Sequence, residues 1–195
     1  MQTDLITDNM KEEKYIQKAI SLFKSEGMSM PIEIVAERIG VTKKTLYNNF
    51  ESKDGLISRC MEKIMEDFRS DMECLCNPSL GVQESFVAGI NALRAFFKGL
   101  SSTFLTDFFK LYPNRASSDH TIGFEIFTTK LADHIKWGQR EKFYRKEIDS
   151  DLTAKYIAFS VFGYFRKYIL TGGEFSAEHY FSQVIDFNLN ALLTK

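Results

Sequence analysis

Residues 34–50 read IVAERIGVTKKTLYNNF, and this stretch decides how the N-terminal part of the chain folds. Ile34, Val35 and Ile39 predict the apolar face of a short helix. Gly40 predicts its end, because glycine adopts the positive φ of a helix C-terminus at little cost. Thr42 can cap a second helix that follows at once. The stretch therefore predicts two short helices joined by a tight turn.

The second predicted helix has two sides of different chemistry. Leu46 and Phe50 are four residues apart and fall on one face, which we expect to pack inward. The other face carries cations, amides and hydroxyls, the groups that contact phosphates and base edges in a DNA major groove. Its residues are Lys43, Lys44, Thr45, Tyr47, Asn48 and Asn49. A helix-turn-helix is the favoured interpretation.

A longer string around this stretch resembles the DNA-binding domain of TetR-family transcriptional regulators. The string runs from Ala36 to Tyr47 and continues with Phe50, Ser52, Lys53 and Leu56. The resemblance implies an all-α chain of about nine helices, with an N-terminal three-helix helix-turn-helix domain and a helical ligand-binding and dimerisation domain. It places the first domain at residues 1–51, a fourth helix starting at residue 52, and the second domain at 52–195.

The resemblance also suggests roles for the polar residues. Thr42, Tyr47 and Lys53 would hold phosphates, and the remaining polar residues of the second helix would lie near the groove. Which side chains read bases stays open. The sequence departs from the family pattern between Gly27 and Ala36, where the spacing is one residue short and Met30-Pro31 replaces a common Ser or Thr cap. Whether this shortened connection alters DNA docking also stays open.

The charge of the chain is local rather than global. The 195 residues carry a formal net charge of -1, which argues against binding nucleic acid by bulk charge. Between Arg38 and Arg59, however, five cations face two acids, a local charge of 5 − 2 = +3. This pattern is typical of a module that presents one basic surface to phosphate.

The rest of the sequence predicts helices, because apolar residues recur at intervals of three and four. A first helix is expected from about residue 9 to residue 25. The residues expected to lie in the later helices are 57–75, 82–100, 103–112, 124–137, 151–170 and 177–193. The segment from Tyr156 to Leu170 is apolar nearly all around, which predicts burial on more than one side.

The TetR resemblance implies a dimer through the last two helices, in which Ala158 and Gly163 allow close approach. It further implies a small apolar ligand among the fourth to eighth helices. The candidate ligand-binding residues are Phe104, Phe108, Tyr112, Phe127, Trp137, Phe159, Phe162, Tyr164 and Tyr168. Core packing alone explains most of these aromatic residues.

Other chemistry finds little support in the sequence. His120 and His134 are fourteen residues apart and cannot share a metal ion from one helix, and no nucleophile stands at a recognisable spacing from them. Cys74 and Cys76 are more typical of small buried hydrophobic residues than of a redox pair. We therefore expect no catalytic residue, no metal and no cofactor. With three cysteines and no apolar run of membrane-spanning length, we expect a cytoplasmic protein outside the membrane.

Taken together, the TetR resemblance implies a homodimeric regulator, a repressor that a small apolar molecule releases from its double-stranded DNA operator. One alternative is a nucleoid-associated or cell-division factor that binds DNA without a small-molecule effector. Another is a helical binding protein that has lost DNA binding. The ligand, the operator sequence, the regulated genes and the sign of regulation are not specified by the sequence.

Overall fold

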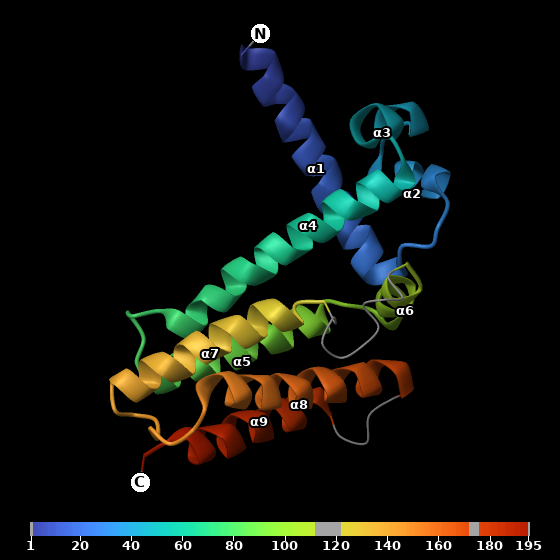
Figure 1. Cartoon of the computed structure of the whole chain (residues 1–195). Coiled ribbons are helices and arrows are strands. Elements are labelled where there is room, and N and C mark those ends of the chain that lie inside the picture. The colour runs from blue at the N-terminus through green and yellow to red at the C-terminus, as the bar shows by residue number, and fades with distance from the viewer. Residues whose placement is uncertain (1, 112–121, 172–175, 195) are drawn as a thin grey trace. The chain divides into compact units, whose positions relative to one another are not determined.

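The computed structural model describes residues 2–111, 122–171 and 176–194 (Figure 1). These residues form nine α-helices and one short 3-10 helix, η1, which confirms the predicted all-α fold. The elements are α1 (Gln2–Glu26), α2 (Ile32–Ile39), α3 (Lys43–Phe50), α4 (Lys53–Asp71), η1 (Met72–Cys76), α5 (Val82–Lys98), α6 (Ser102–Leu111), α7 (Phe124–Arg140), α8 (Ser150–Thr171) and α9 (Ala177–Leu192). Within the described ranges, no helix has the length and apolar character needed to cross a bilayer.

The chain divides into two compact units. The N-terminal unit comprises Met1–Asp67 and Gly99–Leu111, and the C-terminal unit comprises Phe68–Lys98 and Tyr112–Lys195. This division differs from a single boundary at residue 52, because α6 packs against α1 and so belongs with the helix-turn-helix. The division into two functional domains at residue 52 stays a prediction.

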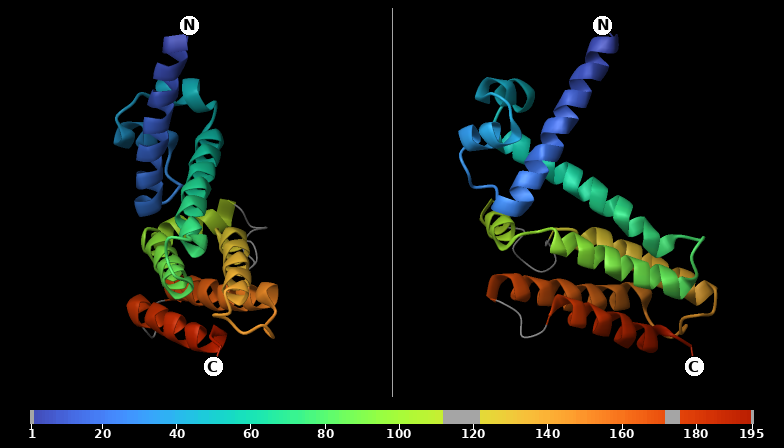
Figure 2. Two further views of the ribbon diagram at one scale, coloured as in Figure 1. Left: turned by 90° about the vertical axis from the view of Figure 1, so that its left-hand side faces the viewer. Right: turned by 180° about the vertical axis from the view of Figure 1, so that it is seen from behind.

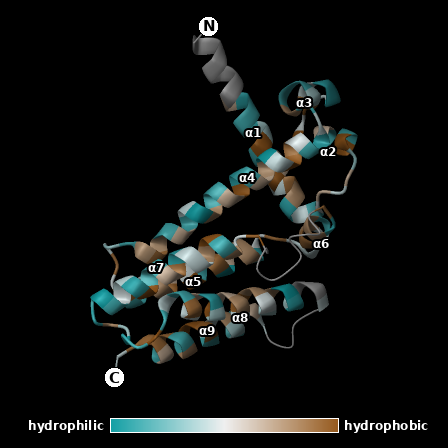
Figure 3. Ribbon diagram, in the orientation of Figure 1, coloured by the Kyte–Doolittle hydropathy of each residue, from teal (hydrophilic) through white to brown (hydrophobic). Residues whose placement is uncertain are grey.

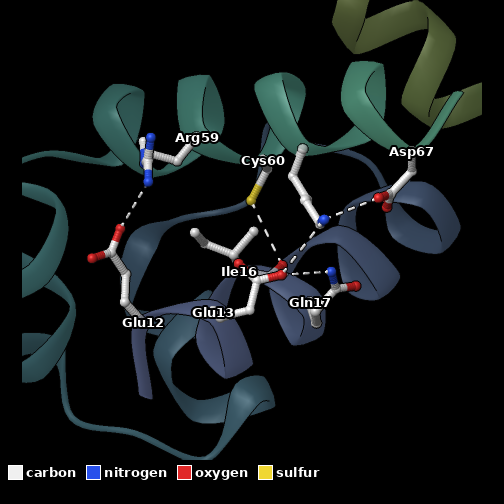
Figure 4. Close-up of polar contacts among 8 residues, drawn as sticks. Glu12, Glu13, Ile16, Gln17, Arg59, Cys60 and Asp67 are labelled. Carbon is white, nitrogen blue, oxygen red and sulfur yellow. Dashed lines mark hydrogen bonds and ion pairs between the residues drawn. The ribbon is translucent and has the colours of Figure 1, made fainter. Parts of the chain in front are cut away.

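The N-terminal unit is held together where α4 crosses α1 (Figure 4). At the crossing, the thiol of Cys60 donates to the carbonyl oxygen of Ile16 at 3.9 Å. Burial raises the pKa of the Cys60 thiol to about 12, so it stays protonated and serves as a small apolar residue. At the edge of the crossing, Arg59 pairs with Glu12 at 3.3 Å. Ile16 and Cys60 are both buried at the crossing, whereas the exposed ion pair adds little to stability.

Most helix ends differ from the predicted ones by one to three residues, and three differences concern the start or the continuity of a helix. The first helix begins at Gln2 rather than near residue 9, since residues 2–8 contain no proline or glycine to stop it. The segment 57–75 is not one α-helix, because α4 ends at Asp71 and η1 continues it. Helix α8 begins at Ser150 rather than Asp151, because the carboxylate of Asp149 accepts the backbone N–H of Leu152 at 2.9 Å.

The C-terminal unit has an aromatic core between two layers, with α5 and α7 in one layer and α8 and α9 in the other (Figure 2). Phe97 of α5 stacks on Phe165 of α8, with ring centroids 3.7 Å apart. Phe162 meets Phe97 edge to face at 5.0 Å and also lies within 6 Å of Phe127 of α7. Such geometry is favourable between aromatic rings and fixes the relative positions of these helices.

Helix α8 buries one side in this core and leaves the other side open. Ala158 is buried within the chain, so it cannot mediate close approach to a second copy as predicted. A Cβ added at Gly163 would meet no atom within 4 Å, so this residue does lie on an open side. The apolar character all around α8 therefore comes from two faces, and the chain itself covers one of them.

His134 ties three segments of the C-terminal unit together from a fully buried position. Its Nδ1 donates to the carbonyl oxygen of Leu75 in η1 at 2.6 Å, because a carbonyl can only accept. Its Nε2 then accepts from the hydroxyl of Tyr144 at 2.8 Å. Burial lowers the pKa of His134 to about 4. The imidazole is therefore neutral in the folded chain at ordinary pH.

Because His134 takes up a proton more readily in the unfolded chain, acid should favour unfolding. The stabilisation by the neutral ring is complete above pH 6.5 and is lost as the pH falls from 6.5 towards 4. We expect this residue alone to lower the free energy of unfolding by roughly 3 kcal/mol across that range. Urea unfolding at several pH values, compared with His134→Gln, which keeps a donor and an acceptor but does not titrate, measures the difference. Equal pH dependence of the two proteins would contradict the assignment.

Candidate nucleic-acid interface

The turn between α2 and α3 forms as the sequence predicts. The prediction for Ile34 is wrong, because Ile34 is 40% exposed, whereas Val35 and Ile39 are buried. Gly40 ends α2 with φ +77°, in the left-handed region. The N–H of Val41 donates to the carbonyl oxygen of Ala36 at 2.9 Å, which closes the helix end. The ammonium group of Lys18 on α1 donates to the carbonyl oxygen of Ile39 at 2.7 Å. Helix α1 thus satisfies one of the last carbonyls of α2 and helps to hold the turn in place.

Helix α3 has the predicted N-cap, and the predicted face of the helix is buried. The hydroxyl oxygen of Thr42 accepts the backbone N–H of Thr45 at 3.1 Å. Leu46 and Phe50 are 1% and 5% exposed, so their face is the buried one. The polar face points outward, and Figure 3 shows α3 mostly in hydrophilic teal. Its exposed residues are Thr42, Lys43, Lys44, Tyr47, Asn48 and Asn49, whereas Thr45 and Lys53 are half-buried. That these residues contact DNA stays a prediction.

Besides the capping contact between Thr42 and Thr45, Lys43 and Asn49 of this polar face also have partners in the chain itself. Lys43 forms an ion pair with Glu33 of α2, and its ammonium group lies 5.7 Å from the centre of the Tyr47 ring. The hydrogen bond between them lowers the pKa of Glu33 and raises the pKa of Lys43, so both stay charged at neutral pH. The side-chain amide of Asn49 donates to the carbonyl oxygen of Thr45 at 2.7 Å.

Three further members of the predicted DNA-binding set are without such partners. Within the part of the chain that the structure describes, no hydrogen bond or ion pair is formed by the side chains of Lys44, Asn48 or Lys53. Lys44 and Asn48 are also exposed, so they can reach a duplex without breaking a contact. In the predicted set, Lys44 and Asn48 can thus contact DNA directly, whereas Lys43 and Asn49 must first give up a contact within the chain.

The turn before α2 is held by a residue that sequence reasoning did not single out. Asp107 of α6 is 4% exposed, and its Oδ2 accepts the backbone N–H groups of Met28 and Ser29 at 2.6 and 2.8 Å. Its Oδ1 accepts the hydroxyl of Ser29 at 2.5 Å. Burial opposes ionisation, but these donors outweigh it and lower the pKa of Asp107. A buried carboxylate thus binds α6 to the turn between α1 and α2.

The same turn accommodates the departure from the family pattern. Pro31 occupies the N-cap position of α2 and provides no side-chain cap. Gly27 has φ +91°, and a Cβ there would lie 2.5 Å from an oxygen of Asp107, so glycine is required for both conformation and space. One signal in the sequence could have revealed Asp107. It is an acidic residue on the apolar face that Phe104 and Phe108 define, three and one residues away.

The candidate ligand-binding residues fall in different units. Phe104 and Phe108 lie on α6 in the N-terminal unit, and both are fully buried. The C-terminal unit contains Phe127, Trp137, Phe159, Phe162, Tyr164 and Tyr168. Phe127 and Phe162 are core residues, whereas Phe159 is 40% exposed. Tyr112 lies outside the described residues. Their role in ligand binding stays a prediction.

An open groove of about 450 Å³ lies elsewhere on the C-terminal unit, between α5 and α9. Its lining contains none of the candidate ligand-binding residues and consists of Leu80, Gln83, Glu84, Val87, Ala88 and Leu189. Of the two histidines considered above, His134 is used in the core and His120 lies outside the described residues. Among the described residues, no three or more His, Cys, Asp or Glu side chains gather as metal ligands would.

Comparison with known proteins bears on the helix-turn-helix directly. A family model, described as bacterial regulatory proteins of the tetR family, matches residues 16–60, which include α2, the turn and α3. A TetR transcriptional regulator from Chloroflexus aurantiacus has a similar structure, with a TM-score of 0.72 and 14% identity over 96% of this chain and 98% of that one. Residues 16–60 therefore resemble the N-terminal domain of tetR-family regulatory proteins.

Two other solved structures extend the similarity of fold. One is SmeT, the repressor of the Stenotrophomonas maltophilia efflux pump SmeDEF, with a TM-score of 0.67 and 16% identity over 94% of this chain and 91% of that one. The other is the fatty acid degradation regulator FadR from Bacillus halodurans, with a TM-score of 0.68 and 16% identity over 92% and 94%. Among curated proteins, none matches this sequence. TetR-family proteins are DNA-binding transcriptional regulators that act as dimers, and many respond to small molecules.

Removing the buried carboxylate of Asp107 should destabilise the N-terminal unit. Asp107→Ala leaves the N–H groups of Met28 and Ser29 without their acceptor, and we expect a loss of about 2–4 kcal/mol in the free energy of unfolding. Asp107→Asn keeps an acceptor oxygen and should lose less. Urea unfolding, with Glu66→Ala as an exposed control, measures the loss. Equal stability of Asp107→Ala and the control would contradict the assignment.

Proposed function

We propose that this chain is a homodimeric, ligand-responsive repressor that binds a double-stranded DNA operator through α3 and is released by a small apolar molecule. A regulator of this kind acts in the cytoplasm, where the chromosome is. The observation that carries the proposal is the orientation of α3. Its apolar residues are buried in the N-terminal unit, while cations, amides and hydroxyls point away from that unit.

The polar face suits a duplex for chemical reasons. Lysine side chains and a helix N-terminus favour phosphate, and asparagine can form paired hydrogen bonds with adenine in the major groove. Asn48 is exposed and has no partner within the described residues, which supports a role in reading bases. Lys53 lies in the first turn of α4, where its charge can reach a phosphate beside the groove.

The open side of α8 supports the homodimer. Leu152, Tyr156 and Phe159 follow one another at helical spacing and are 68%, 64% and 40% exposed. Gly163 continues the same stripe, and Phe187 on α9 is 67% exposed. Large apolar side chains gathered on one face are typical of a protein interface. A second copy would cover this face and form a four-helix bundle from two pairs of α8 and α9.

A dimer would also contact more base pairs than one α3 helix can. A single short helix contacts few base pairs, but two copies about 34 Å apart can enter successive major grooves together. The proposed effector would bind among the candidate aromatic residues of the C-terminal unit and change the separation of the two α3 helices. A coupling of about 1–3 kcal/mol would change operator affinity by roughly 5- to 150-fold, which is enough to release DNA.

Two substitutions test the DNA-binding face. Lys53→Ala should weaken binding to every duplex and reduce the slope of log affinity against log salt by about 0.9 per chain. Asn48→Ala should cost about 1–3 kcal/mol at particular base pairs and leave the other positions unchanged. Duplexes selected from a random pool, followed by gel-shift titration at several salt concentrations, measure both effects. Failure of the wild-type chain to shift any duplex at low salt would contradict the proposed function.

A charge placed on the open side of α8 tests the dimer. Tyr156→Glu should shift the protein from a dimer to a monomer of 22.5 kDa, because two carboxylates would meet across the two-fold axis in an apolar interface. Operator binding should weaken with it, since the two α3 helices are no longer linked. Leu111→Glu, at a 43% exposed apolar residue on α6, is the matched control. Sedimentation equilibrium measures the mass, and a monomeric wild-type protein would refute the dimer.

A further inference from the structure

The first turns of α2 and α3 carry opposite charges that meet. Helix α3 begins with Lys43 and Lys44 and has no acidic residue in its first turn. Cations are unfavourable at this end, because the helix dipole places partial positive charge there. Glu33, in the first turn of α2, supplies a carboxylate that pairs with Lys43. The charge of Lys43 is thereby balanced within the chain.

This pair differs from the other ion pairs of the N-terminal unit. Arg59 lies on α4 and its partner Glu12 on α1, so neither belongs to the polar face of α3. Lys43 does belong to that face. Of the lysines on that face, it is the one that has an acidic partner within the described residues. Glu33 therefore engages a cation that the proposed function assigns to DNA.

A carboxylate binds an ammonium group through the same kind of interaction as a phosphate. Both present anionic oxygens that accept short, charge-assisted hydrogen bonds. The side chains of Lys43 and Glu33 are 50% and 56% exposed, so the pair is open to solvent and can exchange partners readily. A phosphate that approaches Lys43 must displace the carboxylate or remain beside it. In either case, the pair contributes no net charge towards the duplex.

We propose that Glu33 is an internal competitor of DNA phosphate for Lys43, which lowers the affinity of the chain for every duplex and weakens the salt dependence of binding. This inference rests on the proposed DNA-binding function. It assigns Glu33 control over the overall strength of binding rather than over the choice of sequence, because phosphate contacts carry no direct sequence information. Non-specific binding, which is almost wholly electrostatic, should respond as strongly as operator binding.

The substitution Glu33→Gln tests the proposal, because glutamine keeps the size of the side chain and removes its charge. The slope of log affinity against log salt should steepen by about 0.9 per chain. For a dimer, the gain in affinity over wild type at 50 mM salt should therefore exceed the gain at 200 mM by about tenfold. Operator and unrelated duplexes should gain equally. Gel-shift titration of both duplexes at several salt concentrations measures the gain.

Glu66→Gln is the matched control, since it changes the net charge equally from an exposed position on α4. It should leave affinity close to that of wild type. Adding Lys43→Gln to Glu33→Gln should abolish the gain, because the released cation is then absent. If Glu33→Gln behaves like Glu66→Gln while the wild-type chain binds DNA, the inference is overturned and the proposed function stands. If the wild-type chain binds no duplex, the proposed function fails and the inference fails with it.

The contact itself can be measured without DNA. Pairing with Lys43 lowers the pKa of the Glu33 carboxyl, so Lys43→Gln should raise that pKa towards its ordinary value. A pH titration of the Glu33 side-chain carboxyl followed by NMR, in wild type and in Lys43→Gln, reports the change. An unchanged pKa would overturn the pairing on which the inference depends, whatever the DNA-binding assays show.

Discussion

The burial of Leu46 and Phe50 is the constraint on which the functional reading of this chain depends. Successive residues of a helix point about 100° apart, so a rotation of α3 by one residue would replace its inward face with polar side chains. The resulting loss of apolar burial opposes that rotation. Because Leu46 and Phe50 must face inward, Lys44 and Asn48 must face outward. The N-terminal unit thus fixes both the position and the chemistry of the surface it presents.

Local features of this arrangement were predictable, because their causes lie within a few residues of each other. The end of α2 at Gly40 and the cap of α3 at Thr42 each depend on contacts that span no more than four residues, and the structure confirms both. Asp107 could not be placed in this way. It binds residues 78 and 79 positions earlier, and its partners are backbone groups that every sequence contains.

Helix α8 shows a second limit of sequence reasoning. A helix that is apolar all around predicts burial on several sides, but the pattern is the same whether the covering helix belongs to the same chain or to a second copy. Ala158 and Gly163 are both small, yet the chain buries the first and leaves the second open. Only the packing of α8 against α7 distinguishes the two faces and shows that Tyr156 lies exposed on the open one.

The ion pairs of the N-terminal unit change how its charge should be counted. The sequence gives five cations between residues 38 and 59, but Arg38, Lys43 and Arg59 each pair with a glutamate of the same unit. Lys44 and Lys53 have no such partner within the described residues. Each phosphate neutralised contributes to affinity through the counterions it releases, so a unit with two uncommitted lysines binds weakly on its own. In the proposed dimer, joining the N-terminal units of two copies would multiply their separate affinities through effective concentration. The apolar side of α8 would then be as necessary for operator binding as the polar side of α3.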